Sequence, residues 1–187
     1  FFFVNRMRPL TEEEAKLVFE KLAKYIGANT KYLLNRTDEE WVFMLHERRV
    51  WYMSKKVANY AQHFARDNLI GCGVAFGKFT HHGRFRLTVT CLDFLAQYAQ
   101  FKIWIKPNQE QSFLYGNNVT RAGLGRITQG CPRYQGVVAY NMADVPLGFG
   151  VAAQSTMAMH KLETSAYVLF HEADVADYLR NEEHLAG

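Results

Sequence analysis

The stretch Lys102-Ile103-Trp104-Ile105-Lys106-Pro107 begins the part of the chain that decides the fold, and Pro146-Leu147-Gly148-Phe149-Gly150-Val151 follows further along. The first stretch fits a short apolar strand closed by proline, and residues 110–114 then fit about one helical turn. Arg121, Gly123, Gly125 and Arg126 follow. Because glycine allows positive φ and close backbone approach, we expect a tight loop that carries cations towards a phosphate backbone or another protein.

Upstream of this stretch, the clearest pattern is a helix that begins after Thr11. Thr11 and Glu14 fit a capping box, and apolar residues recur at helical spacing as far as Ile26. Short strands are predicted at 32–35, 41–45 and 50–53, which would form an antiparallel meander. Ser54 is expected to cap a helix over 55–66 whose inner face carries Val57, Tyr60, Ala61 and Phe64.

Two further strands, 69–80 and 84–90, are predicted around a His81-His82-Gly83 turn, and a helix over 92–99 closes this half of the chain. We therefore expect two domains, residues 7–99 and 100–180. No Gly/Ser-rich linker separates the two domains. Residues 1–6 precede Met7, which we expect to be the usual start, and they fit no periodic pattern.

Composition is that of an ordinary globular protein, with 49% hydrophobic and 21% charged residues among 187. Three dispersed cysteines give no disulfide framework and no zinc-binding pair, so we expect a reducing compartment and no metal or other cofactor. No apolar run reaches the length of a membrane span, so we expect an intracellular protein without a membrane. The net charge of +4 is concentrated in residues 1–100, where 15 Lys and Arg face 10 Asp and Glu.

Catalytic motifs are weak. The glycines of 71–77 resemble a dinucleotide fingerprint, but the third is misplaced and a strand follows, so we interpret them as relief for bulges and close strand packing. His171, Glu172 and Asp174 form the one polar cluster suggestive of acid–base chemistry, yet residues 173–180 fit a surface helix with Val175 and Leu179 inward. We therefore expect a protein that is not an enzyme.

Cations alternate with aromatic residues between Phe76 and Arg86. Arg84 and Arg86 share a face opposite Phe85, and Lys78 lies on the neighbouring strand. Such a basic hairpin could contact phosphates while its aromatic rings stack on bases. Most alternations of this kind, however, only reflect a strand with one buried face and one solvent-exposed face. The residues favour neither interpretation.

Residues 102–180 resemble a PUA domain, a small RNA-binding β-barrel. From Met7 onward the chain is similar to a eukaryotic family of 60S ribosomal subunit assembly factors that ends in such a domain. The shared blocks are Met7-Arg8-Pro9-Leu10-Thr11-Glu12-Glu13-Glu14, Phe76-Gly77-Lys78-Phe79-Thr80, Trp104-Ile105-Lys106-Pro107, Gln111-Ser112-Phe113-Leu114-Tyr115-Gly116-Asn117, Gly123-Leu124-Gly125-Arg126-Ile127-Thr128 and the run from Ala143 to Ala153.

The resemblance implies an α+β protein with an N-terminal antiparallel sheet flanked by helices and a C-terminal PUA-like β-barrel. It also implies a monomeric, non-catalytic factor of the nucleus and nucleolus, which binds precursor ribosomal RNA, other pre-60S assembly factors and ribosomal proteins during pre-rRNA processing. The expected RNA-binding residues of the barrel are Lys106, Arg121, Arg126, Gln154, Ser155, Thr156 and Lys161, with Lys78, Arg84 and Arg86 as a second patch.

Two alternatives remain open at this point. Residues 154–159 carry no cation, so that region could meet protein, and the chain would then be an adaptor within pre-ribosomal particles. An RNA-modifying enzyme is a third interpretation, because PUA domains often accompany such enzymes. The sequence does not reveal which rRNA segment or which assembly factors are bound, nor when the factor enters and leaves.

Overall fold

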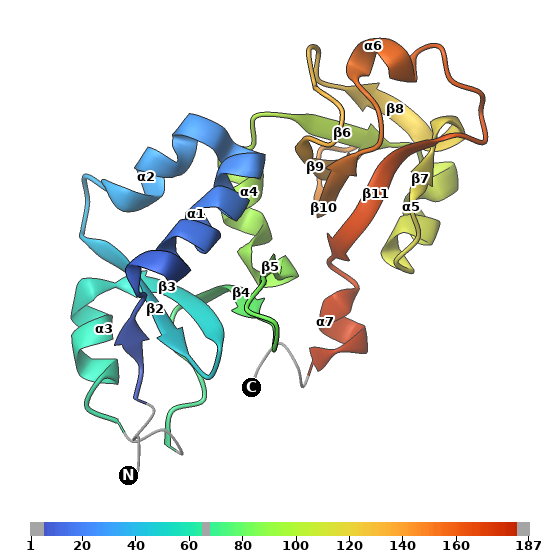
Figure 1. Cartoon of the computed structure of the whole chain (residues 1–187). Coiled ribbons are helices and arrows are strands. Elements are labelled where there is room, and N and C mark those ends of the chain that lie inside the picture. Colours follow the sequence, from blue (N-terminus) through green and yellow to red (C-terminus); the bar gives the residue numbers. More distant parts are fainter. Residues whose placement is uncertain (1–5, 65–67, 183–187) are drawn as a thin grey trace. The chain divides into compact units, whose positions relative to one another are not determined.

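The computed structural model describes residues 6–64 and 68–182, and the chain divides into two compact units (Figure 1). Residues 28–91 and the chain before Lys24 belong to the first unit. Residues 24–27 and 92–180 belong to the second. Helix α4 (Leu92–Tyr98) therefore groups with the second unit, whereas the sequence prediction placed it in the first. Residues 1–5, and 65–66 at the end of a predicted helix, lie outside the described residues.

Helix α1 (Glu12–Ile26) begins at the predicted capping box. The Thr11 hydroxyl accepts a hydrogen bond from the Glu14 amide at 3.2 Å, and the Glu14 carboxylate accepts one from the Thr11 amide at 2.9 Å. These two bonds satisfy backbone donors that a helix start otherwise leaves without partners. The 3-10 turn η1 (Gly27–Thr30) and the short helix α2 (Lys31–Leu34) follow directly.

The first unit contains a five-stranded antiparallel sheet in the order β1-β2-β3-β4-β5, which confirms the expected antiparallel sheet and, of the predicted meander, the pairing of 41–45 with 50–53. Phe43 faces α1, where its ring lies 5.6 Å from that of Phe19. On the other face Met44 and Met53 belong to a core that includes Ala58 and Ala61 of α3 (Lys55–Ala61). The strands are β1 (Arg8–Pro9), β2 (Trp41–His46), β3 (Arg49–Ser54), β4 (Val74–Phe79) and β5 (Phe85–Leu87), followed by the 3-10 turn η3 (Val89–Cys91).

Three details of the first unit differ from the sequence prediction. The predicted strand 32–35 is helix α2, because a short apolar run cannot distinguish strand from helix and the chain is already helical in η1. Residues 69–73 lie outside β4. Helix α3 ends at Ala61, earlier than the predicted helix over 55–66. It buries Ala58 and Ala61, as its small residues allow close approach to the sheet, and leaves Val57 and Tyr60 exposed, as is Phe64 beyond its end.

The second unit is a nearly closed barrel of six strands in the order β7-β11-β10-β9-β6-β8. The pair β6–β9 is parallel and the other pairs are antiparallel. The interior is apolar and includes Ile103, Phe113, Val137 and Leu169. The strands are β6 (Lys102–Ile105), β7 (Val119–Thr120), β8 (Leu124–Ile127), β9 (Gly136–Asn141), β10 (Pro146–Ala152) and β11 (Tyr167–Asp174). The fold class expected from the sequence is thus confirmed.

The two outer strands of this order, β7 and β8, are joined by the three-residue turn η4 (Arg121–Gly123). Helix α5 (Pro107–Leu114) lies beside this junction, because the Gln109 side chain accepts a hydrogen bond from the Thr120 amide at 2.9 Å. The turn that carries Arg121 therefore connects the two outer strands, whereas Arg126 of the predicted loop lies on β8.

The C-terminal part of the barrel differs from the predicted helix over 173–180. Strand β11 continues to Asp174, and only Asp177–Arg180 form helix α7. Leu179 is 88% exposed, and Val175 donates its amide to Leu147 at 2.8 Å. The pairing of β11 with β10 extends to Asp174. Backbone N–H and C=O groups of residues 173 and 174 therefore form hydrogen bonds within the sheet, where a longer helix would have needed them for its own hydrogen bonds.

Candidate nucleic-acid interface

Three cations predicted from the sequence meet at one groove of the barrel. Lys106, Arg121 and Arg126 line it together with His160 and Thr164, and its volume is about 440 Å³. Lys106 precedes α5, Arg121 begins η4 and Arg126 lies on β8, so three separate elements contribute. His160 and Thr164 carry no signal in the sequence, because they lie 34 and 38 residues beyond Arg126.

Backbone hydrogen bonds hold the rim of this groove. The Lys106 amide donates to the Gly123 carbonyl at 2.8 Å, and the Arg121 amide donates to the Ala166 carbonyl at 2.8 Å. The exposed Lys106 therefore extends from a backbone position fixed on η4. Fixed backbone positions reduce the conformational entropy that binding would otherwise cost.

Arg121 is held by one of its own guanidinium donors. Its Nη2 donates to the His160 carbonyl at 3.0 Å, and the side chain is partly buried. A guanidinium has five N–H donors, so this contact orients the group and leaves donors for an anion. His160 thus contributes to the groove through its backbone.

Arg126 lies against an aromatic ring. Its guanidinium carbon is 3.8 Å from the centroid of the Trp104 ring, and Trp104 is the register partner of Arg126 on β6. The Trp104 ring in turn stacks on Tyr140 at 5.8 Å, and the Lys102 ammonium lies 5.3 Å from the Tyr140 ring. Cations and aromatic rings therefore alternate across β8, β6 and β9. The residues that form this arrangement lie far apart in the sequence.

The predicted region after β10 contributes unevenly. Gln154 and Ser155 are partly buried, and Ser155 caps the short helix α6 (Thr156–Met159) by accepting from the Ala158 amide at 3.3 Å. Thr156 must be removed from the candidate contacts, because it is 1% exposed. Its hydroxyl accepts from the Cys131 amide at 3.1 Å and donates to the Thr128 carbonyl at 2.8 Å. Lys161 is exposed just after α6.

The second predicted patch lies on the β4–β5 hairpin of the first unit. Lys78 and Arg86 are register partners and both are exposed, while the neighbouring pair Phe79 and Phe85 is buried. Arg84 is exposed in the turn, where its amide donates to the Thr80 hydroxyl at 3.2 Å. The alternation of one wet and one buried face is therefore present, and the exposed face carries the cations.

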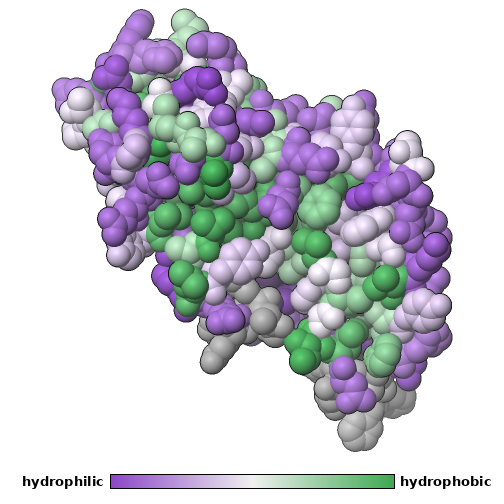
Figure 2. Space-filling view, turned by 180° about the vertical axis from the view of Figure 1, so that it is seen from behind, coloured by the Kyte–Doolittle hydropathy of each residue, from purple (hydrophilic) through white to green (hydrophobic). Residues whose placement is uncertain are grey.

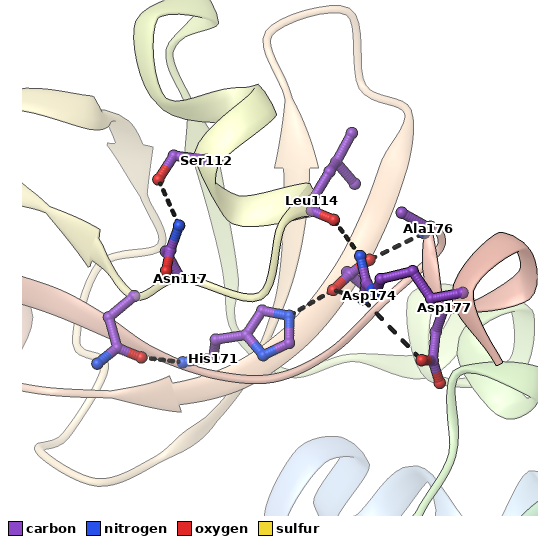
Figure 3. Close-up of polar contacts among 9 residues, drawn as sticks. Ser112, Leu114, Asn117, His171, Asp174, Ala176 and Asp177 are labelled. Carbon is purple, nitrogen blue, oxygen red and sulfur yellow. Dashed lines mark hydrogen bonds and ion pairs between the residues drawn. The ribbon is translucent and has the colours of Figure 1, made fainter.

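The acid–base cluster considered from the sequence forms a structural network (Figure 3). Asp174 is fully buried, and its carboxylate contacts His171 Nε2 at 2.6 Å and Arg180 Nη2 at 2.8 Å. It also accepts from the Ala176 amide at 2.8 Å, and Arg180 donates to the Leu114 carbonyl. These contacts join β11, α7 and α5, so the carboxylate has its partners within the fold, as a buried charge requires.

The surface carries several hydrophobic groups among hydrophilic residues, as Figure 2 shows for one face. The most exposed large hydrophobic side chains of the second unit are Leu179, Met157 and Tyr115. Among the residues that the structure describes, no helix is long and apolar enough to cross a membrane, and no three His, Cys, Asp or Glu side chains gather as metal ligands.

The nearly closed barrel with its basic rim, preceded by a sheet-and-helix unit, defines a protein that carries a PUA domain. Family descriptions agree: NIP7/UPF0113, pre-PUA domain matches residues 7–89, and UPF0113 PUA domain matches residues 101–183. The chain belongs to the family of 60S ribosome subunit biogenesis protein NIP7. A homologue from Xenopus laevis is 57% identical over 96% of this chain and 99% of its own length, and one from Tetraodon nigroviridis is 56% identical over the same shares.

Solved structures show the same fold at low sequence identity. A PUA domain structure from Aeropyrum pernix K1, solved as a tartrate complex, aligns with a TM-score of 0.62 at 16% identity and covers 97% of this chain and 92% of its own. A hypothetical protein from Pyrococcus horikoshii OT3 aligns with a TM-score of 0.59 at 14% identity, over 96% and 99% of the two chains. These likenesses establish the two-domain fold alone.

Proposed function

We propose that this chain is a non-catalytic RNA-binding factor that acts in pre-rRNA processing during assembly of the 60S subunit. The family to which it belongs is named for 60S ribosome subunit biogenesis. The single observation that carries RNA binding is the meeting of Lys106, Arg121 and Arg126 at one groove of the barrel. Two guanidinium groups and one ammonium group at the same groove can bind the phosphates of a nucleic-acid backbone, because a guanidinium donates two parallel hydrogen bonds to phosphate oxygens.

The geometry favours contact with the backbone over reading of the base sequence. Arg121 is oriented by the His160 carbonyl, and the Arg126 guanidinium lies 3.8 Å from the centroid of the Trp104 ring, so both guanidinium groups are pre-organised. Phosphate contacts of this kind position an RNA without specifying its sequence. Gln154, Ser155 and Lys161 do not line the groove and would add polar contacts elsewhere on the second unit, and Lys78, Arg84 and Arg86 of the first unit would add further cations.

The proposed setting follows from the family. The chain would bind precursor ribosomal RNA, other pre-60S assembly factors and ribosomal proteins as a monomer in the nucleus and nucleolus. No step of catalysis is assigned, because the buried Asp174 with its His171 and Arg180 partners serves the packing of α7.

Salt-dependent binding tests the proposal. The protein is titrated with a structured rRNA fragment between about 50 and 200 mM salt, where backbone binding weakens steeply because phosphate contacts release counterions. Arg121→Ala/Arg126→Ala should bind more weakly on all RNA sequences, and its salt slope should be smaller by about 1 for each phosphate that the variant no longer binds.

A matched control removes two exposed cations elsewhere. Lys31→Ala/Lys56→Ala makes the same change in net charge on α2 and α3, and neither residue lines the groove. If the arginine variant and the control bind RNA with equal affinity, the assignment of RNA binding to this groove is wrong. Absence of RNA binding at low salt would contradict the proposed function.

A protein adaptor is the second candidate, and exposed apolar side chains favour it. Met157 is 79% exposed on α6, and Tyr115 is 70% exposed after α5. Large exposed hydrophobic side chains are common where proteins meet. Under this alternative, binding to pre-60S proteins would be insensitive to Arg121→Ala/Arg126→Ala and would fall with Met157→Ser, measured by co-purification of the particle.

A further inference from the structure

One cleft of the first unit is lined mainly by charged residues. Its volume is about 750 Å³. Glu13, Glu14 and Leu17 of α1 line it, as do the ends of two hairpins. The cations that line it are Arg6, Arg8, Arg48, Arg49 and Lys78, and the other lining residues include Glu47 and His81.

The tips of the β2–β3 and β4–β5 hairpins lie side by side at this cleft. The Phe79 amide donates to the Arg48 carbonyl at 2.8 Å, and Arg48 Nη1 lies 3.0 Å from His81 Nδ1. Two turns that are far apart in the sequence are therefore joined by backbone and side-chain contacts.

Three neighbouring strands place cations at matching positions beside the cleft. Arg49 of β3 is the register partner of Lys78 of β4, and Lys78 is the register partner of Arg86 of β5. Register partners lie on one face of a sheet with their Cβ atoms about 5 Å apart. Like charges directly opposite one another destabilise a sheet, so an anion that contacts this row would relieve part of that repulsion.

Cations outnumber carboxylates among the residues that line the cleft. The Glu14 carboxylate binds the Arg8 guanidinium through two hydrogen bonds of 2.8 and 2.9 Å, so these two charges largely compensate each other. Burial lowers the pKa of Arg49, and the nearby charge of Glu47 offsets this only in part. Among the described contacts, Arg48 donates to a histidine ring and not to a carboxylate.

The turn that presents Arg48 is strained. Glu47 and Arg48 have φ values of +50° and +68°, in the left-handed region that two-residue hairpins usually fill with Asn-Gly. Neither residue type favours this conformation, and such strain is often found at functional sites. The backbone of this turn is therefore strained at the position from which the Arg48 side chain extends beside the cleft.

We propose that Arg48 and the row Arg49, Lys78 and Arg86 bind the phosphodiester backbone of RNA, at a site separate from the barrel groove. A row of cations suits a polymer with regularly repeated charge better than it suits a single anion. Guanidinium groups bind phosphate oxygens through two parallel hydrogen bonds. The ligand class rests on the proposed RNA-binding function, whereas the site does not share residues with the groove.

Amide chemical shifts measured by NMR test the two sites independently. The ¹⁵N-labelled full chain is titrated with a uridine 12-mer at about 50 mM salt, where backbone contacts are strong. We expect the amides of Arg48, Arg49 and Lys78 to shift in the wild type and also in Arg121→Ala/Arg126→Ala. Shifts confined to the barrel would overturn this inference and leave the proposed function intact. Shifts confined to the cleft would support this inference and contradict the assignment of RNA binding to the barrel groove, and no shifts at either site would contradict both.

Affinity gives the second measurement. Arg48→Gly/Lys78→Gln in the Arg121→Ala/Arg126→Ala background should weaken binding of the 12-mer about ten-fold and lower the salt slope by about 2. Glycine suits the turn, so this variant should fold. Lys31→Gln/Lys56→Gln in the same background is the matched control, and affinity equal to that control would contradict the site. Competition by polyglutamate as strong as that by the 12-mer would assign the cleft to acidic protein segments instead.

Discussion

The guanidinium carbon of Arg126 lies 3.8 Å from the centroid of the Trp104 ring, across the pairing of β8 with β6. Trp104 is itself fixed, because its Nε1 donates to the Asp144 carboxylate at 2.6 Å. A flexible cation on the barrel surface is thereby held in one orientation, at the groove that also receives Lys106 and Arg121. The aromatic ring contributes both stability and pre-organisation.

Arg126→Ala should lower the free energy of unfolding by about 0.5–1 kcal/mol, the usual value of an exposed cation–π contact. Arg126→Lys keeps the charge but loses the planar fork, so it should recover only part of this stability and bind RNA more weakly than the wild type. Urea denaturation and RNA titration measure the two effects. Wild-type stability and affinity in Arg126→Lys would show that the stacking has no role.

Thr156→Val should destabilise the second unit by about 1–3 kcal/mol, because the buried Cys131 amide and Thr128 carbonyl would lose their partner. RNA affinity per folded molecule should remain unchanged, since Thr156 is buried. Thermal denaturation and RNA titration provide the measurements. If Thr156→Val bound RNA more weakly without any loss of stability, Thr156 would be an RNA-binding residue after all.

Asp174→Ala should destabilise the protein by about 1.5–3 kcal/mol, the range for hydrogen bonds to a charged group. The substitution takes a buried acceptor from His171, Arg180 and the Ala176 amide (Figure 3). Urea denaturation measures the change, and Glu163→Gln is the control because Glu163 is exposed in the same unit. Equal stability of the two variants would show that this network does not hold α7.

Glu47→Asn/Arg48→Gly should stabilise the first unit by about 1–2 kcal/mol, because both residues would then suit the left-handed turn. The same variant should bind RNA more weakly, since it lacks the Arg48 cation. Thermal denaturation measures the stability of this variant against that of the wild type. A destabilised variant would show that the observed turn is not strained.

Cysteine reactivity should differ among the three thiols. Burial raises the pKa of Cys131 to about 11 and also raises the pKa of Cys91, so both are protonated at pH 8. Burial raises the pKa of Cys72 too, but this residue is partly exposed. Iodoacetamide should label Cys72 at least about ten-fold faster in the native protein, because only an accessible thiolate reacts. Mass spectrometry measures the rates, and equal labelling would contradict the burial of Cys91 and Cys131.

Local patterns in the sequence determined much of the fold. The capping box at Thr11, the helical spacing of α1, the short apolar runs of β2 and β3 and the alternation within the β4–β5 hairpin depend on neighbours a few residues apart. The sequence was ambiguous where a segment was short. The four residues of α2 could equally fit a strand, and the pairing of β11 with β10 decided that residues 173 and 174 are not helical.

The residue types of the candidate site could be read from the sequence, since cations beside glycines and prolines indicate an exposed loop. Only the tertiary structure decided which of them meet. The fold of the barrel brings Arg121 to Lys106. Thr156 is buried, so its hydroxyl bonds within the protein. Strand register aligns Arg49 with Lys78 and Arg86. These relationships depend on contacts between residues far apart in the chain, and no local pattern encodes such contacts.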